Sequence, residues 1–299
     1  MHRIRLKFDE REGVYGAKDH FFHFMLAYLL PSIHFFFKNL KKGITKNNIG
    51  IFLEFEDCGP LMNPVIKELT ELLDIPNEII NKQINSFDEI VYVPRWDKEL
   101  RDSFFFIFHH NKKFIFNKII LIRLIKEVVF KFDLGSIRFK FREDLLFTRK
   151  IILQRLNNLE RPDNPTYLLL DRSDNHSYYT TKGETYGKAR RGLLNLEEGF
   201  NDLIKKGVPV NIIQPGSHSI LYQIEAFNQS KGVIGIRGAE FANLIWLEPG
   251  SKVVVLSKAI LIPHLRNYAA LLGLKLVVKG RDTDYPNMLD YNFKEILRK

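Results

Sequence analysis

Residues 233–251 read VIGIRGAEFANLIWLEPGS, and this stretch decides the fold. Its first part, VIGIRG at 233–238, predicts a buried strand, and AEFANLIWL at 239–247 predicts a short helix. Gly238 stands between them, where a glycine allows a sharp turn or the close approach of a ligand to the backbone. A buried strand that leads directly into a helix is the repeating unit of an α/β sheet.

The same alternation extends outward from this unit over residues 166–280. Strands are predicted at 166–172, 208–215, 252–257 and 275–280, and helices at 195–207, 219–232 and 263–272. Short connections between alternating strands and helices are typical of a parallel, doubly wound sheet covered on both faces. We therefore predict an α/β fold whose ligands bind beyond the carboxyl ends of the strands.

The first half of the chain has a less regular pattern of the same kind. Strands are predicted at 48–57 and 89–95, helices at about 19–40, 63–75 and 143–159, and a basic helical region at 115–132. The polar segment NLERPDNPT at 158–166 contains two prolines and is the predicted linker. The expected domains are therefore 1–160 and 161–299.

The segment HFFHFMLAYLLPSIHFFF at 20–37 comes nearest to a membrane span. It contains three histidines and a central Pro31, whereas a span needs about 20 uninterrupted apolar residues. We therefore predict a buried helix that ends near Pro31.

Three predicted strand ends in the second half carry polar side chains: Asp171-Arg172-Ser173, Gln214-Pro215-Gly216-Ser217 and Arg237-Gly238-Ala239-Glu240. The helix that begins near Ala239 directs free N–H groups and a partial positive charge beyond the strand. With the guanidinium of Arg237, this end suits a phosphate or diphosphate, and Glu240 could accept hydrogen bonds from a sugar or ribose hydroxyl. Alternatively, Glu240 only favours the start of the helix and pairs with Arg237.

A second basic cluster consists of Arg190 and Arg191, which precede Asn195, a predicted N-cap with Glu197 and Glu198 in the following turn. Paired arginines just before a helix could reach phosphates at the neighbouring strand ends, or they could lie in a solvated turn. The sequence contains neither a GxGxxG fingerprint nor a GxxxxGK[ST] loop, so neither a dinucleotide site nor a P-loop is supported.

The late part of the chain resembles glycosyltransferase family 61. This group of inverting enzymes includes plant xylan-decorating transferases, animal O-linked N-acetylglucosaminyltransferases and many bacterial capsule or lipopolysaccharide proteins. Its late motif has the form His-Gly-Ala-Gly-Leu-x-Asn, followed by an apolar run and Pro-Gly-Ser. Residues 237–243, RGAEFAN, and Pro249-Gly250-Ser251 match this motif.

Other segments are similar to the family in the same order along the chain. Arg172 matches an arginine at a strand end, and Arg191 with Asn195 matches an arginine shortly before an asparagine. In the first half the similar segments are His23-Phe24 with Leu30-Pro31, FEDCGPLMNP and VYVPRW, so that the resemblance covers roughly 15–290.

The resemblance implies a GT-B architecture, in which two Rossmann-like domains face each other across a cleft. A nucleotide sugar, expected to carry UDP, would bind to the second domain, and a glycan or lipid-linked glycan acceptor would bind to the first. The implied reaction is one direct, inverting displacement that needs no metal or other cofactor, in the synthesis of a surface polysaccharide such as capsule or lipopolysaccharide. The implied donor-binding residues are Arg172, Arg190, Arg191, Asn195, Arg237, Gly238, Ala239, Glu240 and Asn243.

The sequence departs from the family motif at two positions that matter for the chemistry and at one apolar position: Arg237 replaces its histidine, Glu240 replaces the glycine after alanine, and Phe241 replaces its leucine. Arginine still binds phosphate, but it stays protonated and cannot assume a role in proton transfer. The identity of the donor therefore stays open. Loss of the histidine also gives some support to an alternative, a non-catalytic protein of the same fold that binds a nucleotide sugar or a glycan.

The general base of such a reaction is expected in the first half. His23 lies where the family has its first-domain histidine, and an imidazole titrates near neutral pH. The alternative role for His23 is that of a packed, hydrogen-bonded histidine. Asp57 is the second candidate for the base and Asp19 the third. Asp282-Thr283-Asp284 has the spacing of a DxD motif but falls in a late loop, so we predict a surface position for it.

The charge of the chain is strongly positive and unevenly placed. The 299 residues carry a net charge of +10, and 111–150 contain eleven Lys or Arg against four Asp or Glu, a net of +7. An amphipathic helix with solvated lysines is the first interpretation of 111–150. The alternatives are contact with an anionic membrane surface or with phosphate-bearing substrates. RNA is a further alternative, but no nucleic-acid-binding motif is recognised and nucleic acid is not an expected partner.

The cysteine usage and the N-terminus bear on the location of the protein. One cysteine, Cys58, cannot form an internal disulfide, which fits a reducing compartment, and no Cys/His cluster has zinc-ligand spacing. The N-terminal MHRIRLKFDE lacks the apolar core of a signal peptide. We therefore expect a cytoplasmic protein that contacts the inner membrane face peripherally through 111–150.

Overall fold

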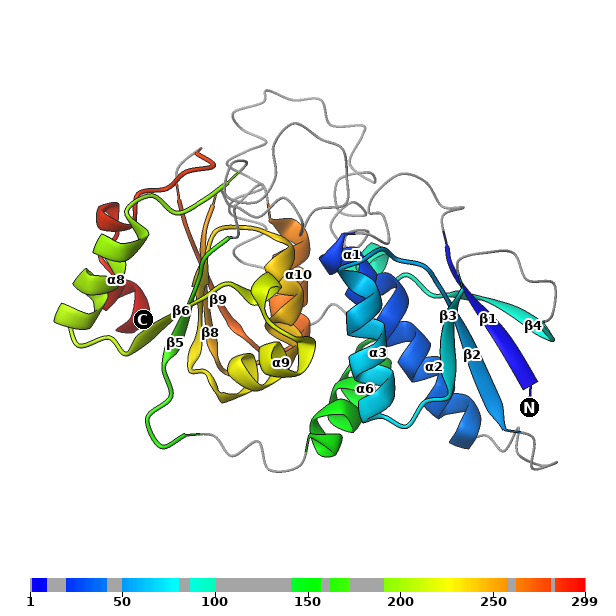
Figure 1. Cartoon of the computed structure of the whole chain (residues 1–299). Helices are drawn as coiled ribbons and strands as arrows, with labels where there is room; N and C mark the ends of the chain where they lie inside the picture. Colours follow the sequence, from blue (N-terminus) through cyan, green and yellow to red (C-terminus); the bar gives the residue numbers. More distant parts are fainter. Residues whose placement is uncertain are drawn as a thin grey trace, which may run out of the picture.

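The computed structural model describes residues 2–9, 20–41, 50–80, 87–100, 141–156, 162–172, 191–257, 262–280 and 283–298. Each half of the structure contains one parallel sheet (Figure 1). The first has the strand order β3-β2-β1-β4 and contains β1 (His2–Phe8), β2 (Ile51–Glu56), β3 (Asn77–Ile80) and β4 (Glu89–Val93). The second has the order β6-β5-β7-β8-β9 and contains β5 (Tyr167–Leu170), β6 (Val210–Ile213), β7 (Gly232–Gly235), β8 (Lys252–Leu256) and β9 (Lys275–Lys279).

The strand order creates a topological switch point in each sheet. In the first sheet, β2 and β3 lie on one side of β1 while β4 lies on the other. In the second sheet, β6 lies on one side of β5 while β7, β8 and β9 lie on the other. Ligands of open α/β sheets bind at the carboxyl ends of the strands that flank such a point. The expected ligand positions are therefore the ends of β1 and β4 and the ends of β5 and β7.

One continuous helical run follows β1 along the chain. It consists of α1 (Phe21–Phe24), the π-helical η1 (Met25–Leu29) and α2 (Leu30–Lys41). The helix predicted at about 19–40 is therefore confirmed, whereas the prediction that it ends near Pro31 is wrong. A proline inside an α-helix removes one hydrogen bond, but here a π turn precedes it, in which the N–H of Leu30 donates to the carbonyl of Met25. This local change of hydrogen bonding lets the helix pass through Pro31.

The same run is apolar and long enough to cross a membrane by composition alone. Residues Phe21–Asn39 have a mean hydropathy of 1.2, but 72% of this window is buried against the rest of the protein. In the structure the segment packs as a core helix, as the sequence predicts.

Helices occupy the space between the two sheets (Figure 1). Those of the first half are the α1–η1–α2 run, α3 (Met62–Leu72) and α6 (Arg142–Arg155), and those of the second are α9 (Ile220–Gln229), the 3₁₀ helix η6 (Ala239–Trp246) and α10 (Pro263–Leu271). α8 (Leu196–Lys205) and α11 (Phe293–Arg298) cover the other face of the second sheet with a separate apolar cluster that includes Leu203, Ile234 and Phe293. The predicted doubly wound sheet of the second half, covered on both faces, is confirmed.

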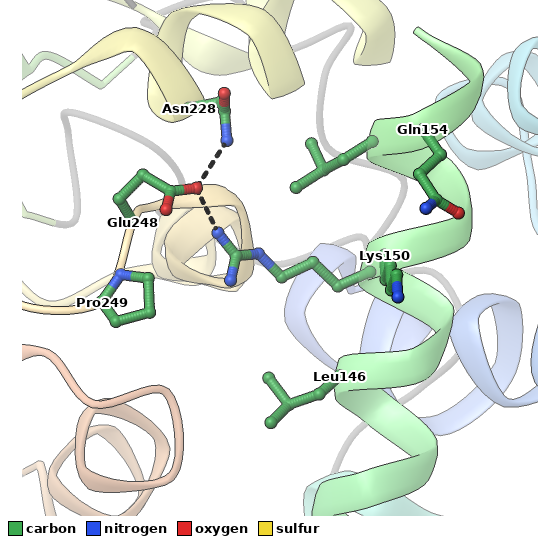
Figure 2. Close-up of a pocket in the computed structure, with 8 residues that line it drawn as sticks. Leu146, Lys150, Gln154, Asn228, Glu248 and Pro249 are labelled. Carbon is green, nitrogen blue, oxygen red and sulfur yellow. Dashed lines mark hydrogen bonds and ion pairs between the residues drawn. The ribbon is translucent and has the colours of Figure 1, made fainter.

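α6 connects the two halves through polar contacts. Nη2 of Arg149 donates to the carbonyl oxygen of Leu247 and to Oε1 of Glu248, both at 2.9 Å, and Nδ2 of Asn228 donates to the same Oε1 at 3.3 Å (Figure 2). These side chains line a pocket of about 550 Å³ between α6 and the segments that precede β7 and β8. Because segments that precede parallel strands lie at the amino edge of a sheet, this pocket is at the edge opposite to the β5/β7 crevice.

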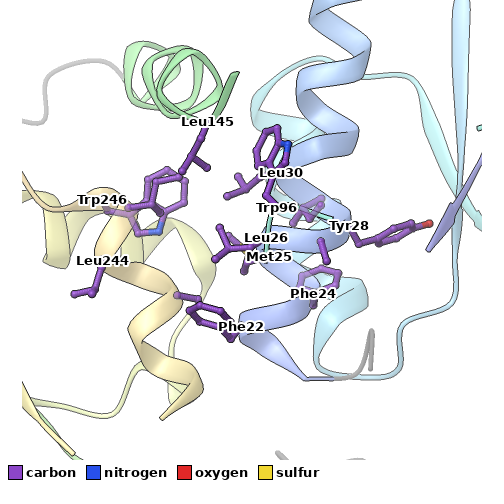
Figure 3. Close-up of a cluster of buried hydrophobic side chains, with 14 of the residues drawn as sticks. Phe22, Phe24, Met25, Leu26, Tyr28, Leu30, Trp96, Leu145, Leu244 and Trp246 are labelled. Atoms are coloured by element: carbon purple, nitrogen blue, oxygen red, sulfur yellow. The ribbon is translucent and has the colours of Figure 1, made fainter. Parts of the chain in front are cut away.

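A single apolar core extends through both halves. Figure 3 shows this core, with Phe22 and Leu26 of the helical run and Leu145 of α6 from the first half, and Leu244 and Trp246 of η6 from the second. Phe22 is 5% exposed and the other four are fully buried. The two sheets therefore share one hydrophobic interior.

The other predicted elements are confirmed with small differences in their bounds. The strands at 48–57 and 89–95 and the helices at 63–75 and 143–159 are β2, β4, α3 and α6. The helix expected at 219–232 ends at Gln229, and Gly232 begins β7 instead. The segment at 239–247 is a 3₁₀ helix. The basic region at 115–132 and residues 158–161 of the linker lie outside the described residues.

Candidate functional site

Two arginines lie just beyond the ends of β5 and β7, where a ligand crevice is expected. Arg172 follows β5 and Arg237 follows β7, on the two sides of the switch point. A side chain placed at Gly238 would have its Cβ 3.5 Å from the guanidinium carbon of Arg172, so the Arg172 head lies against the backbone next to Arg237. Arg191 joins them, because its Nη1 donates to the carbonyl oxygen of Arg237 at 3.2 Å. The structure thus brings together three of the arginines that the sequence proposed for a phosphate site.

Two carboxylates balance part of this positive charge. Nε of Arg172 donates to Oε1 of Glu240 at 3.1 Å, so Arg172, and not Arg237, is the partner of Glu240. Nη2 of Arg237 donates to Oδ1 of Asp284 at 2.8 Å, and Nε of Arg191 lies 3.8 Å from the same oxygen. Three arginines against two carboxylates leave the cluster with a net charge of +1.

Asp284 is a site residue that sequence reasoning missed. It was predicted as a surface residue of a late loop, and its side chain is 45% exposed. However, the backbone N–H of Gly192 donates to the Asp284 carbonyl at 3.2 Å, and that of Leu194 donates to the Pro286 carbonyl at 3.0 Å. These bonds fix the late loop beside Arg191. Its sequence gives no signal of this pairing because the contact is purely tertiary.

Some buried nitrogens of the cluster lack an acceptor. Within the described part of the chain, Nη1 of Arg172 and Nε of Arg237 are buried and have no hydrogen-bond partner. A buried N–H without an acceptor is costly, and charged donors the more so. Charged donors of this kind favour an anionic ligand with several oxygens.

Glu240 covers the start of η6. Its carboxylate folds back so closely over Gly238 that a Cβ there would lie 2.1 Å from Oε2. Gly238 has an extended backbone, so its missing Cβ serves this close approach and not a sharp turn. Glu240 itself lies in the first turn of η6, where a negative charge is favourable.

The remaining donor-site candidates lie in different surroundings. Ala239 packs against the apolar core. Asn243 is fully buried, and its amide donates to Gln223 at 2.8 Å and accepts from the indole N–H of Trp246 at 3.2 Å. Asn195 occupies the N-cap position of α8 in a left-handed conformation, with φ 54°, but its side chain makes no capping bond. Arg190 lies outside the described residues.

His23 lies at the carboxyl edge of the first sheet, as part of α1. Its Nδ1 is 2.6 Å from Oδ2 of Asp97, a residue whose side chain is only 3% exposed. Arg95 binds the same carboxylate through both oxygens, from Nη2 at 2.7 Å and from Nε at 3.1 Å. Burial alone would raise the pKa of Asp97, but the hydrogen bonds from His23 and Arg95 lower it below its ordinary value.

Arg95 is anchored at the switch point of the first sheet. It follows β4, its guanidinium lies 4.6 Å from the ring centre of Phe8 at the end of β1, and its Nη1 donates to the Asp9 carbonyl at 3.4 Å. Sequence reasoning singled out the strand end VYVPRW but not Asp97, the next residue. Its place directly after a strand end was the available signal.

The other candidates for a base are placed differently. Oδ1 of Asp57 accepts hydrogen bonds at 2.8 Å from the backbone N–H of Gly59 and from Nδ2 of Asn63, which fixes the loop before α3. Asp19 lies outside the described residues.

His264 lies close to both halves of the site. It is the second residue of α10, after β8, and its ring is 5.5 Å from that of Phe22, the neighbour of His23. Burial, together with the nearby His23 and Arg237, lowers the pKa of His264 to about 4. Its imidazole is therefore neutral at pH 7. His264 was not singled out from the sequence, and it connects the His23 side of the site with the arginine cluster.

The chain matches the family model described as glycosyltransferase 61 over residues 21–254. The matched range contains His23, Asp97 and the three arginines of the cluster, whereas His264 and Asp284 lie beyond it. No curated protein matches the chain.

Proposed function

The chain belongs to glycosyltransferase family 61 and is a glycosyltransferase, and we propose that it transfers a sugar from a nucleotide-sugar donor to a glycan acceptor with inversion at the anomeric carbon. The observation that carries this proposal is the position of His264, which lies near His23 of α1 in the first half and near Arg237, after β7, in the second. A proton acceptor and an anion site thereby share one region.

The donor phosphates are assigned to the crevice between β5 and β7. Arg172 and Arg237 flank it with buried N–H groups that lack an acceptor among the described residues. Guanidinium groups bind phosphate oxygens in a bidentate manner and stay charged as the leaving group departs. Arg191 supplies further positive charge, and Glu240 is assigned to a hydroxyl of the sugar or ribose. UDP is the nucleotide we propose.

The base is assigned to His23. Within the described residues Nε2 of His23 has no hydrogen-bond partner, and the His23 side chain is 25% exposed, so an acceptor hydroxyl can reach it. The hydroxyl oxygen attacks the anomeric carbon while its proton moves to Nε2. The bond from that carbon to the phosphate oxygen breaks, and its electron pair stays on the phosphate, where the arginines stabilise the charge.

We propose that donor and acceptor meet in a GT-B-type cleft between the carboxyl edges of the two sheets, with domains at 1–160 and 161–299. Arg172 and Arg237 follow strands of the second sheet, and His23 of α1 lies beside the residues that follow β4 of the first, which supports this arrangement. The arginines are proposed to neutralise the phosphates without a metal. Water must be kept from this region, since it would compete with the acceptor.

The proposed setting is surface polysaccharide synthesis at the cytoplasmic face of a membrane, with a lipid-linked glycan acceptor. This part rests on the family and on the basic segment 111–150. Vesicle sedimentation tests it: binding to anionic vesicles should weaken with salt. Equal binding to neutral vesicles, or none to either, would reject it.

A panel of UDP-sugars, with mass spectrometry of the products and analysis of anomeric configuration, tests the reaction itself. Transfer with inversion is expected. Retention of configuration would exclude the single displacement. Binding of nucleotide sugars with neither transfer nor hydrolysis would favour the non-catalytic alternative.

A further inference from the structure

The geometry around His23 points to a second residue on which proton transfer depends. We propose that Asp97 is a positioning residue for His23 and that Arg95 holds its carboxylate in place. This inference rests on the proposed function, in which His23 is the base.

The contacts define a chain of three side chains. Oδ2 of Asp97 is shared by Nδ1 of His23 at 2.6 Å and Nη2 of Arg95 at 2.7 Å. Nε of Arg95 holds the other oxygen, Oδ1, at 3.1 Å. The bidentate contact from Arg95 fixes the plane of the carboxylate, and the carboxylate in turn fixes the imidazole.

Burial protects the ionic contacts of Asp97 and Arg95 from water. The side chains of Asp97 and Arg95 are 3% and 11% exposed, so water competes little for their charges. A buried carboxylate needs a charged partner to stay ionised, and Arg95 provides it. Arg95 is itself held over the ring of Phe8.

The ionised carboxylate determines the tautomer of His23. A carboxylate can only accept hydrogen bonds, so Nδ1 of His23 must carry the hydrogen. In the neutral ring Nε2 then carries the lone pair. Nε2 is the atom without a partner among the described residues, and it is therefore ready to accept the proton of a hydroxyl. After transfer, Asp97 also stabilises the positive imidazolium.

The same helical run provides a matched control. His34 and Asp144 form a second histidine–carboxylate pair, with Nε2 of His34 3.1 Å from Oδ1 of Asp144. This pair joins α2 to α6, and Asp144 is 39% exposed. Asp144→Asn therefore removes the charge from a second histidine–carboxylate contact that no step of the proposed reaction uses.

The first experiment reads the tautomer directly. The full chain is labelled with ¹⁵N-histidine, and long-range ¹H–¹⁵N NMR correlations are recorded near neutral pH, with His23→Gln used to assign the His23 signals. We expect the Nδ1–H form of His23 in the unaltered chain. Asp97→Asn should change that form, and Asp144→Asn should leave it unchanged. An Nε2–H form of His23 in the unaltered chain would overturn the proposal, even if Asp97→Asn fails to fold.

The second experiment measures turnover with the UDP-sugar that the panel identifies. Asp97→Asn should lower kcat by about 10²–10⁴ with little change in KM for the donor. The acid limb of its pH profile should move to lower pH, because the imidazolium has lost its anionic partner. Asp97→Glu should restore part of kcat.

These measurements separate two kinds of failure. If His23→Ala keeps normal turnover, the base of the proposed function is wrong. If His23→Ala is inactive while Asp97→Asn keeps its kcat and pH profile, only the positioning role of Asp97 is rejected.

Discussion

Arg237 and Asp284 form an ion pair of 2.8 Å between the end of the third strand of the second sheet and a loop near the end of the chain. Asp284 therefore binds the arginine to which we assign the donor phosphates. We propose that a donor phosphate would replace Asp284 as the partner of Arg237.

Replacing Arg237 should reduce the stabilisation of the transition state more than it reduces the stability of the fold. Arg237→Ala is expected to cost about 2–4 kcal/mol in kcat/KM, comparable to losing an oxyanion donor, and Arg237→Lys should restore only part because the planar fork is lost. Steady-state kinetics and titration with UDP measure both. Arg155→Ala is the control, since Arg155 is 49% exposed and pairs with Asp74 at the surface. Unchanged turnover in Arg237→Ala would remove this residue from the site.

Removing Asp284 should act in the opposite direction on donor binding. Asp284→Asn frees Arg237 from a half-exposed ion pair, a contact worth up to about 1 kcal/mol. We therefore expect UDP to bind up to about fivefold tighter, as measured by isothermal titration. Weaker binding in Asp284→Asn would mean that the carboxylate orients the arginines instead of competing with the donor.

Asn243 should prove structural. Its amide is buried between Gln223 and Trp246, and removing it leaves Oε1 of Gln223 and the indole N–H of Trp246 without these bonds. Asn243→Ala is expected to lower the free energy of unfolding by about 1–3 kcal/mol while the folded protein keeps its UDP affinity. Urea titration and isothermal titration give the two values. Loss of UDP affinity at unchanged stability would restore Asn243 to the donor site.

Acid should destabilise the fold through His264. Its pKa is lowered from 6.5 to about 4, so between these values the unfolded chain binds a proton that the folded chain does not. The contribution of His264 to the free energy of unfolding is therefore fully present above about pH 6.5. It decreases as the pH falls toward 4, by about 3 kcal/mol at the acid end.

Comparison with His264→Gln isolates the contribution of His264. This control is needed because burial also lowers the pKa of His34, which adds its own dependence of stability on pH. Urea titrations at about pH 7.5, 6 and 5 should show a smaller loss of stability in the variant. Parallel curves for the two proteins would contradict the assignment.

Metal removal tests the role given to the arginines. If they neutralise the leaving phosphate, a chelator such as EDTA should leave turnover unchanged. Loss of activity in EDTA that is restored by Mg²⁺ or Mn²⁺ would show that a cation shares this role.

The second half of the fold could be predicted because its strands are continuous apolar runs separated by short helices, as in β7 and β8. β1 was not predicted, although its alternation of basic and apolar residues is typical of a half-buried strand. Ile4 and Leu6 lie in the core, while Arg5 on the other face donates to Glu54 at 2.9 Å. The basic side chains made this strand hard to recognise in the sequence, because each is neutralised by a carboxylate on another strand of the sheet.

The site was predictable in part for a related reason. Arg172 and Arg237 follow predicted strands, so topology alone brings them together. Asp97, Asp284 and His264 depend on how distant segments pack, and no local pattern encodes that. The continuation of the helix past Pro31 could not be predicted either. The π turn that accommodates this proline is a backbone adjustment without a sequence signature.

The shared apolar core has a consequence for how substrates reach the enzyme. Phe22 of the first half packs edge-on against Tyr268 of the second, with ring centres 5.9 Å apart. Opening the molecule like a hinge would expose this seam to water at roughly 25 cal/mol for each Å² of apolar surface. We therefore expect the two sheets to keep one orientation throughout the catalytic cycle, so that small-angle X-ray scattering gives the same radius of gyration with and without UDP.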